Sequence, residues 1–366
     1  MTKALTLIDD FRELFTHDTP LIDTRAPIEF AQGAFPYTDS LPLMSDKERE
    51  AVGTCYKNQG QDSAIELGHQ LVSGEVKQAR IQAWLAFIKQ HPEGALYCFR
   101  GGLRSQIAQR WIYEASGIDY PRIKGGYKAL RRFLIDETAR IIAQVTPVVI
   151  GGQTGCGKTL LLDRLEQKID LEGLANHRGS AFGNTITGQP TQISFENQLG
   201  IELLKKQHHD TLVFEDEGAN IGTVHIPETL KNKTQVADLV LLEADLETRI
   251  QVSMDAYVIN MYQGFANQQA DTALQNFSNY WLSSLERIQK RLGLERYQVA
   301  KEQVLSALSE FQHRGNFEGF IPIVTSLLVD YYDPMYNYQI SKKADRIVFK
   351  GGADAVLDYL QARSIS

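Results

Sequence analysis

TPVVIGGQTGCGKTLLLDRLEQ, residues 146–167, is the stretch that decides the fold of the second half of this chain. An apolar run, PVVI, is followed by GQTGCGKT, which fits the pattern G-x-x-x-x-G-K-[ST] without a mismatch, and then by an apolar run of helical character. A strand, a glycine-rich loop and a helix in this order form a phosphate-binding loop. We therefore predict that an α/β domain with a phosphate site begins near residue 146.

Each residue type in this loop has a physical task. Glycines let consecutive backbone N–H groups point inward at phosphate oxygens, and the helix N-terminus adds partial positive charge. Lys158 is expected to reach the terminal phosphates, and Thr159 is expected to reach Mg²⁺. The predicted phosphate-binding residues are Gly152, Gln153, Thr154, Gly155, Cys156, Gly157, Lys158 and Thr159.

Two further apolar runs, TLVFEDEG (211–218) and ADLVLLEA (237–244), predict more strands of this domain. The first ends in Glu215, Asp216 and Glu217, at the place where folds of this kind carry a metal-directing carboxylate. These acids are candidate metal ligands, with a solvated acidic loop as the alternative, and no metal ligand is certain. Arg249, in LEADLETRI, stands where nucleotide kinases of this class often carry an arginine, which is a weak signal alone.

The first half of the chain also alternates strands with helices. LIDT (21–24) and GALYCF (94–99) predict buried strands, and ARIQAWLAFIKQH (79–91) and RSQIAQRWIYEAS (104–116) predict helices. In the first of these helices Ile81, Trp84, Leu85 and Ile88 recur at helical spacing. Alternation of this kind predicts a parallel sheet flanked by helices.

Cys98 follows the second strand, and FRGGLRS then leads into a helix. Such a loop aims backbone N–H groups at one point, and positive charge nearby favours a thiolate. The candidate catalytic residues are Cys98, Arg100, Gly101, Gly102 and Arg104. Two chemistries use this cradle, namely sulfur or selenium transfer and phosphate-ester hydrolysis by a Cys-x5-Arg site. A buried structural thiol is the third interpretation.

The composition argues against a disulfide-rich, a cysteine-zinc or a membrane-spanning protein. The chain has 366 residues, a net charge of −7 and three cysteines without a CxxC pair, so we expect no disulfide framework and no cysteine-rich zinc site. The N-terminus does not look like a signal peptide, and no apolar run is long enough to span a bilayer. We expect a cytoplasmic protein without a membrane partner.

The upstream segment LIDTRAPIEFAQGAFPYTDSLPL (21–43) resembles the opening of a rhodanese domain. The resemblance rests on Asp23, Arg25, Glu29, Phe30, Gly33, Leu41 and Pro42. It implies a rhodanese-like sheet whose second strand ends in the active cysteine.

A rhodanese-like half followed by a phosphate loop resembles the tRNA 2-selenouridine synthase family. The motifs that carry this resemblance are ERE-AVGTCYKNQG (48–60), CFRGGLRS, GGQTGCGKT, HRGSAFG (177–183), FEDEGANIG (214–222) and YYDPMY (331–336). The resemblance implies that geranyl diphosphate alkylates the sulfur of a wobble 2-thiouridine and that selenophosphate then replaces the S-geranyl group. It also implies tRNA, bound by its anticodon arm, as substrate and a selenophosphate synthetase as a candidate partner.

A surface for RNA is predicted in PRIKGGYKALRRF (121–133), which has five basic residues and no acid. The candidate tRNA-binding residues are Arg122, Lys124, Lys128, Arg131 and Arg132, with Tyr127 and Phe133 interleaved for base stacking. A solvated helix face is the alternative. Arg178 and Ser180, in HRGSAFG, are candidates for contact with phosphate or with the target base.

The predicted fold class is α/β: a rhodanese-like parallel-sheet domain (1–125), a basic linker helix (126–145), a P-loop kinase-like α/β domain (146–250) and a helical C-terminal region packed on it (251–366). Two other functions stay open at this point. One is a sulfurtransferase-kinase fusion acting on a small molecule, and the other is a phosphatase-like module with a regulatory ATPase.

Overall fold

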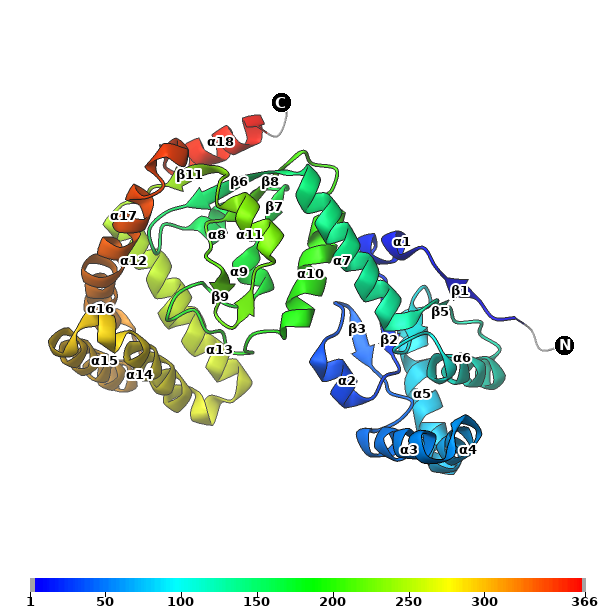
Figure 1. The fold of residues 1–366 in the computed structure, drawn as a ribbon. Helices are drawn as coiled ribbons and strands as arrows, with labels where there is room; N and C mark the ends of the chain where they lie inside the picture. The colour runs from blue at the N-terminus through cyan, green and yellow to red at the C-terminus, as the bar shows by residue number, and fades with distance from the viewer. Residues whose placement is uncertain (1–3, 364–366) are drawn as a thin grey trace. The chain divides into compact units, whose positions relative to one another are not determined.

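The computed structural model describes residues 4–363, which form two compact units (Figure 1). Unit 1 contains the described residues up to 143 together with 191–207, and unit 2 contains 144–190 and the described residues from 208 onward. The predicted class, α/β with parallel sheets and a helical C-terminal region, is confirmed. Among the described residues, no helix is both long and apolar enough to cross a membrane.

Unit 1 is built on a five-stranded parallel sheet with the order β1-β5-β4-β2-β3. The two runs predicted as strands, β2 and β4, are its fully buried neighbours, paired in the register Leu21↔Ala95 and Ile22↔Leu96. The strands are β1 (Leu7–Ile8), β2 (Leu21–Asp23), β3 (Thr38–Ser40), β4 (Ala95–Tyr97) and β5 (Arg122–Ile123).

Helices cover this sheet because their apolar stripes need burial. In the helix predicted at 79–91, Ile81, Trp84 and Ile88 are buried as expected, Leu85 is only partly buried, and Phe87 joins the core in addition. The helices are α1 (Phe11–Thr16), α2 (Pro27–Gln32), α3 (Asp46–Gln59), α4 (Gln61–Leu71), α5 (Gly74–Gln90), α6 (Leu103–Ser116), α7 (Gly126–Gln144) and α10 (Gln192–Lys205).

The division of the chain differs from the four predicted segments in two helices. Almost all of α7 belongs to unit 1, so residues 126–143 do not form a separate linker. Helix α10, predicted within the phosphate-loop domain, also belongs to unit 1, where Asn197 donates its side-chain N–H to the carbonyl of Ala34 (2.9 Å) and Ser194 accepts from the N–H of Ala34 (3.2 Å). The chain therefore leaves unit 2 after residue 190 and returns to it at residue 208.

Unit 2 has its own five-stranded parallel sheet with the order β12-β11-β6-β8-β7. The strand that precedes the phosphate loop, β6, lies in the centre, as its continuous apolar run requires. The strands are β6 (Thr146–Gly151), β7 (Lys168–Ile169), β8 (Thr211–Glu215), β11 (Asp238–Leu242) and β12 (Ile347–Gly351), and β9 (Asn220–Ile221) and β10 (Val224–His225) form a separate hairpin.

The C-terminal region is mostly helical, but it also completes the sheet. Strand β12 pairs with β11, and the last helix buries Val356, Leu357 and Leu360 in the same cluster as Val148 and Ile150 of β6. The predicted helical region 251–366 therefore also contributes an edge strand to the phosphate-loop sheet. The helices of unit 2 are α8 (Lys158–Leu162), α9 (Leu171–Leu174), α11 (Glu228–Thr234), α12 (Leu246–Met254), η1 (Asp255–Ile259), α13 (Asn260–Gln268), η2 (Ala270–Thr272), α14 (Ala273–Leu292), α15 (Leu294–Arg314), η3 (Glu318–Phe320), α16 (Ile321–Ser326), η4 (Leu327–Tyr332), α17 (Asp333–Ser341), η5 (Ala344–Arg346) and α18 (Ala353–Arg363).

Candidate functional site

The phosphate loop connects β6 to α8, as the sequence predicts, and its curvature depends on glycine. Gly155 and Gly157 have φ values of +81° and +87°, which favour glycine over any other residue. A Cβ on Gly155 would lie 2.6 Å from the carbonyl oxygen of Arg249 and from Oγ of Ser253. The loop is therefore pressed against α12 by a contact that no side chain could enter.

Lys158, the first residue of α8, lies among acidic side chains. Its Nζ is 3.5 Å from the carbonyl oxygen of Gly152. Burial by itself lowers the pKa of Lys158, but attraction to Cys156, Tyr336, Glu172 and Glu215 outweighs burial and raises this pKa above its usual value. The ammonium is therefore charged throughout the physiological pH range and is available to an anionic ligand.

A cavity of about 650 Å³ opens beside the loop. It is lined by the loop residues Thr154, Gly155, Gly157, Lys158 and Thr159 and, among others, by Arg178, Ser180, Tyr257 and Tyr336. The structure thus brings HRGSAFG and YYDPMY, which are remote from the loop in sequence, to the same cavity as the phosphate loop. Three predicted residues, Gly152, Gln153 and Cys156, do not line it. Gln153 binds Asn337 and Arg249, and the buried Cys156 packs in the core.

The three candidate acids after β8 have different surroundings. Asp216 forms an ion pair with Lys343 (2.6 Å), so its carboxylate is already engaged. Glu215 is 1% exposed and accepts a hydrogen bond from the backbone N–H of Glu172 at Oε2 (2.9 Å), whereas its Oε1 has no hydrogen-bond partner among the described residues. Glu217 forms a side-chain hydrogen bond with Glu172. Among the three candidates, Glu215 is therefore the one with a buried carboxylate oxygen that has no partner.

Glu172, which the sequence did not single out, lines the cavity and completes a cluster of three acids. Burial and mutual repulsion raise the pKa of Glu172 and of Glu215 to about 8, and they raise the pKa of Glu217 to about 7. Three carboxyl groups with such values beside a phosphate loop are the electrostatic pattern of a functional site.

Arg249 holds the loop from behind. Its guanidinium is buried, donates to the carbonyl of Thr154 (2.9 Å) and to Oε1 of Gln153 (3.0 Å), and forms an ion pair with Asp333 (2.5 Å). Arg249 does not line the cavity. The arginine expected to contact a nucleotide therefore fixes the shape of the loop instead, and Asp333 of YYDPMY is its partner.

The cysteine loop of unit 1 connects β4 to α6, and Cys98 is 3% exposed. Its Sγ lies 3.1 Å from Oγ of Ser105 and 3.8 Å from the carbonyl oxygen of Gly102, and Ser105 in turn lies 3.1 Å from that carbonyl. The Ser105 hydroxyl can turn to donate to a thiolate. Ser105 is not among the predicted catalytic residues. Its position directly after Arg104, in the first turn of α6 and seven residues after Cys98, is the signal in the sequence that points to it.

The segment predicted to bind RNA holds this loop in place. The backbone N–H groups of Tyr127 and Lys128 donate to the carbonyls of Cys98 (2.9 Å) and Phe99 (3.0 Å). A Cβ on Gly126 would lie 2.2 Å from the carbonyl oxygen of Cys98. The glycine pair in KGGY is therefore required for contact between two backbones.

The predicted arginines do not all surround the sulfur. Arg104 forms an ion pair with Glu29 (2.5 Å), and its hydrogen bonds hold the pKa of Glu29 below the usual value although burial acts in the opposite direction. Arg100 is exposed, with its guanidinium 5.8 Å from the ring of Phe99. Arg122 donates to the carbonyl of Gly101, and burial lowers its pKa while Cys98 acts against that shift. The guanidinium of Arg122, which the sequence predicts as an RNA contact, thus lies in the cysteine loop and interacts with Cys98.

Of the five predicted tRNA-binding residues, three keep exposed side chains: Lys124, Lys128 and Arg132. Lys124 and Arg132 form surface ion pairs with Asp9 (3.2 Å) and Asp136 (2.9 Å). Arg131 forms an ion pair with Glu196 of α10. The prediction of stacking aromatics is wrong, because Tyr127 is buried beneath the guanidinium of Arg25 (3.8 Å to the ring centroid) and Phe133 packs on Phe11 and Phe15.

Comparison with known proteins gives consistent results over the whole chain. Residues 145–366 match the family model described as "tRNA 2-selenouridine synthase AAA domain". Proteins named tRNA 2-selenouridine synthase from Marinobacter nauticus and Pseudomonas fluorescens are 49% and 51% identical to the chain, each over 97% of this chain and 98% of the relative. The chain belongs to the tRNA 2-selenouridine synthase family. It is therefore an enzyme, of the kind that family comprises.

The similarity to proteins named tRNA 2-selenouridine synthase extends through both units. The relative from Photobacterium profundum is 50% identical over 96% of each chain, so unit 1 is included as well as unit 2. A solved structure titled as the N-terminal domain of a putative ATP/GTP binding protein from Clostridium difficile 630 is 27% identical, covers 36% of this chain and 99% of that chain, and has a TM-score of 0.32. A TM-score this low does not indicate a shared fold.

Replacing Ser105 by Ala is expected to slow alkylation of Cys98 by iodoacetamide about tenfold near neutral pH. A hydrogen bond to a charged group contributes roughly 1.5–3 kcal/mol, and the variant lacks the hydroxyl that stabilises the thiolate. Peptide mass spectrometry measures the rate, with the more exposed Cys55 as an internal reference. An unchanged rate at Cys98 would show that Ser105 is only part of the packing.

The acidic cluster predicts a pH dependence of stability. Glu215 has a pKa of about 8 in the fold against an ordinary value of 4.5, so its contribution is fully present below pH 4.5 and is lost as the pH rises through 8. Glu215→Gln should therefore flatten the fall in the free energy of unfolding between pH 5 and 8 by about 1 kcal/mol per pH unit. Urea titrations at several pH values measure this slope. The surface variant Glu247→Gln should keep the wild-type slope, and a Glu215→Gln slope equal to it would contradict the assignment.

Proposed function

We propose that this enzyme converts a 5-substituted 2-thiouridine at the wobble position of tRNA into 2-selenouridine, with an S-geranyl intermediate. The observation that carries the proposal is one chain that holds both a cysteine at the start of a backbone cradle and a phosphate loop beside a cavity of about 650 Å³, in a family named for this product. Geranyl diphosphate and selenophosphate are the proposed co-substrates, with a selenophosphate synthetase as the source of the second.

In the first proposed step, the sulfur of the thiouridine attacks C1 of geranyl diphosphate, a C–S bond forms, and the C–O bond to diphosphate breaks. The backbone N–H groups of the phosphate loop and the ammonium of Lys158 would bind the diphosphate both before and after it leaves. Arg178, which lines the same cavity, supplies a second cation. Positive charge held in place before the reaction favours departure of an anionic leaving group.

Mg²⁺ fits the residues at this site. Carboxylate and hydroxyl oxygens are its preferred protein ligands, and Glu172 and the exposed Thr159, which both line the cavity, supply them. The unpartnered Oε1 of the buried Glu215 belongs to the same acidic cluster, because Oε2 of Glu215 accepts the backbone N–H of Glu172. When bound, the ion would neutralise negative charge on the diphosphate. Asp216 is a poorer candidate because Lys343 engages both of its oxygens.

The same cavity has walls suited to a prenyl chain. Val252, Ala256 and the ring of Tyr257 line it beyond the phosphate loop, and its volume lies in the range of pockets that enclose whole small molecules. A site built only for inorganic phosphate would need neither the volume nor the apolar walls. Both features favour a diphosphate ester with an apolar substituent.

In the second proposed step, selenium of selenophosphate attacks C2 of the modified base, and the C–S bond to geranylthiolate breaks. Water then cleaves the Se–P bond, which leaves 2-selenouridine and phosphate. The thiolate of Cys98 is proposed to guide selenophosphate to C2, and the hydroxyl of Ser105 beside it can donate a hydrogen bond to this thiolate. Hydrolysis of phosphate esters by a Cys-x5-Arg site is less well supported, because Arg104, its required cation, is engaged by Glu29.

The two variants Lys158→Ala and Cys98→Ser should separate the steps. Lys158→Ala removes a charged group that binds diphosphate, so formation of S-geranyl-tRNA should fall at least about tenfold. Cys98→Ser should still form S-geranyl-tRNA but should form no 2-selenouridine. The serine hydroxyl stays protonated near neutral pH and cannot replace a reactive thiolate. Mass spectrometry of nucleosides from thiolated tRNA, incubated with both co-substrates and Mg²⁺, measures both products.

Lys290→Ala and Cys55→Ser, at positions outside both sites, are the matched controls and should behave as wild type. Native rates of S-geranylation by Lys158→Ala would assign the phosphate loop to another ligand. Full 2-selenouridine yield from Cys98→Ser would remove Cys98 from the mechanism.

We propose that tRNA lies on the exposed cations of the segment 121–133. Lys124→Glu, Lys128→Glu and Arg132→Glu combined should weaken tRNA binding, and the slope of log K against log[salt] should become shallower by about 2, because each lost phosphate contact accounts for roughly 0.7–0.9. Arg131 is left unchanged because its ion pair with Glu196 supports the fold.

A control with the same change of charge is Lys47→Glu, Lys57→Glu and Lys89→Glu, three exposed lysines elsewhere in unit 1. Binding of labelled tRNA at several salt concentrations compares the two triple variants. Equal affinity and slope in both would move the RNA surface away from this segment.

A further inference from the structure

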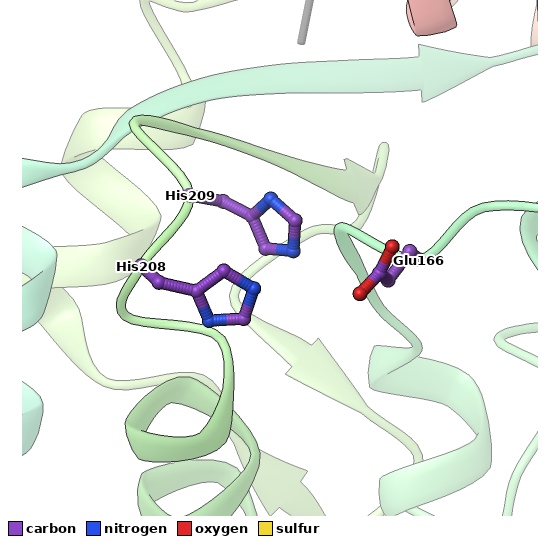
Figure 2. A group of neighbouring side chains, drawn as sticks. All are labelled: Glu166, His208 and His209. Carbon is purple, nitrogen blue, oxygen red and sulfur yellow. The ribbon is translucent and has the colours of Figure 1, made fainter.

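A group of two imidazoles and one carboxylate lies outside both sites described above. Glu166, His208 and His209 each offer one ligand atom, and these atoms all lie within 4.8 Å of one another; they are the one such group of three found among residues 4–363. Figure 2 shows the two histidine rings side by side with the carboxylate of Glu166 facing them. The ring centroids are 4.0 Å apart.

The backbone on both sides of this group is fixed by the sheet of unit 2. Glu166 stands two residues before β7 and His209 stands two residues before β8, and these strands pair in the register Lys168↔Val213. The N–H of Val213 donates to the carbonyl of Gln167 (2.9 Å), and the N–H of Thr146 donates to the carbonyl of Asp210 (2.8 Å). The spacing of the ligand-bearing segments is therefore set by strand pairing and does not depend on a mobile loop.

We propose that Glu166, His208 and His209 form a binding site for a divalent transition-metal ion of the zinc class. Two imidazole nitrogens and one carboxylate oxygen are the donors such ions prefer, whereas Mg²⁺ prefers oxygen donors alone. Ligand atoms on one tetrahedral ion lie about 3.3 Å apart, as bonds of about 2.0–2.2 Å require. Rotation of the exposed side chains of Glu166 and His208 closes the remaining separation without disturbing the core.

The position of the site decides what the ion would do. Glu166 and His209 precede their strands, so the site lies at the amino end of the parallel sheet, whereas the phosphate loop follows the carboxyl end of β6. An ion there is remote from the phosphate cavity and would act on stability. It would join the segment before β7 to the segment by which the chain re-enters unit 2 at residue 208.

Metal titration of the full chain, prepared without an added histidine tag and stripped with a chelator, tests the site. Wild type should bind one equivalent of Co²⁺ with visible d–d absorption. Zn²⁺ at about 100 times its Kd should raise Tm by roughly 5 °C or more. An excess of Mg²⁺ should leave the Co²⁺ spectrum unchanged, because Mg²⁺ prefers oxygen donors and should not displace Co²⁺ from the two imidazoles.

His208→Ala and Glu166→Gln should each weaken Zn²⁺ binding by more than about tenfold, since even the loss of outer-shell partners has an effect of that size. Both side chains are exposed, so the metal-free variants should keep the Tm of metal-free wild type. His313→Ala, another exposed histidine of unit 2, should bind Zn²⁺ as wild type does. Absence of saturable one-to-one binding in wild type, or equal affinity in His208→Ala, would overturn the proposal.

Discussion

Close approach between backbones at glycine is the constraint on which both chemical centres depend. In unit 1, Gly126 lies against the carbonyl of Cys98, and in unit 2, Gly155 lies against the carbonyl of Arg249. Each contact holds a loop that leaves the carboxyl end of a buried parallel strand and enters a helix. A side chain at either position would push the two backbones apart, so the loops could not keep their N–H groups aimed at one point.

The phosphate loop needs support from segments far along the chain. Arg249 bonds the loop from one side and forms its ion pair with Asp333, while Tyr336 lines the cavity from the same α17 helix. The terminal strand β12 then adds an edge to the sheet that carries the loop. The C-terminal region is therefore part of the phosphate site and of its sheet, which explains why the family model spans residues 145–366 as one domain.

The two centres differ in their electrostatics. Lys158 faces carboxyl groups whose pKa values burial and mutual repulsion raise to about 7–8, so an anionic ligand bound there and protons on these carboxyl groups favour each other. Cys98 has fewer free cations around it than its sequence neighbours imply, because Arg104 is neutralised by Glu29. Ser105 and the half-buried Arg122 are instead the groups that act on the sulfur, and both reach it only through the packing of α6 and β5.

The sequence alone determined the features that are local. Buried strands, the phosphate loop and the cysteine loop were predictable, because apolar periodicity and the backbone freedom of glycine act over a few residues. Only the tertiary structure decided which side chains meet. Asp216 is engaged by Lys343, Arg249 by Asp333 and Arg131 by Glu196, and Glu172 joins Glu215, in pairs that are 43 to 127 residues apart in the chain. Whether a charged residue binds a ligand or supports the fold depends on such partners, and spacing along the chain carries no information about them.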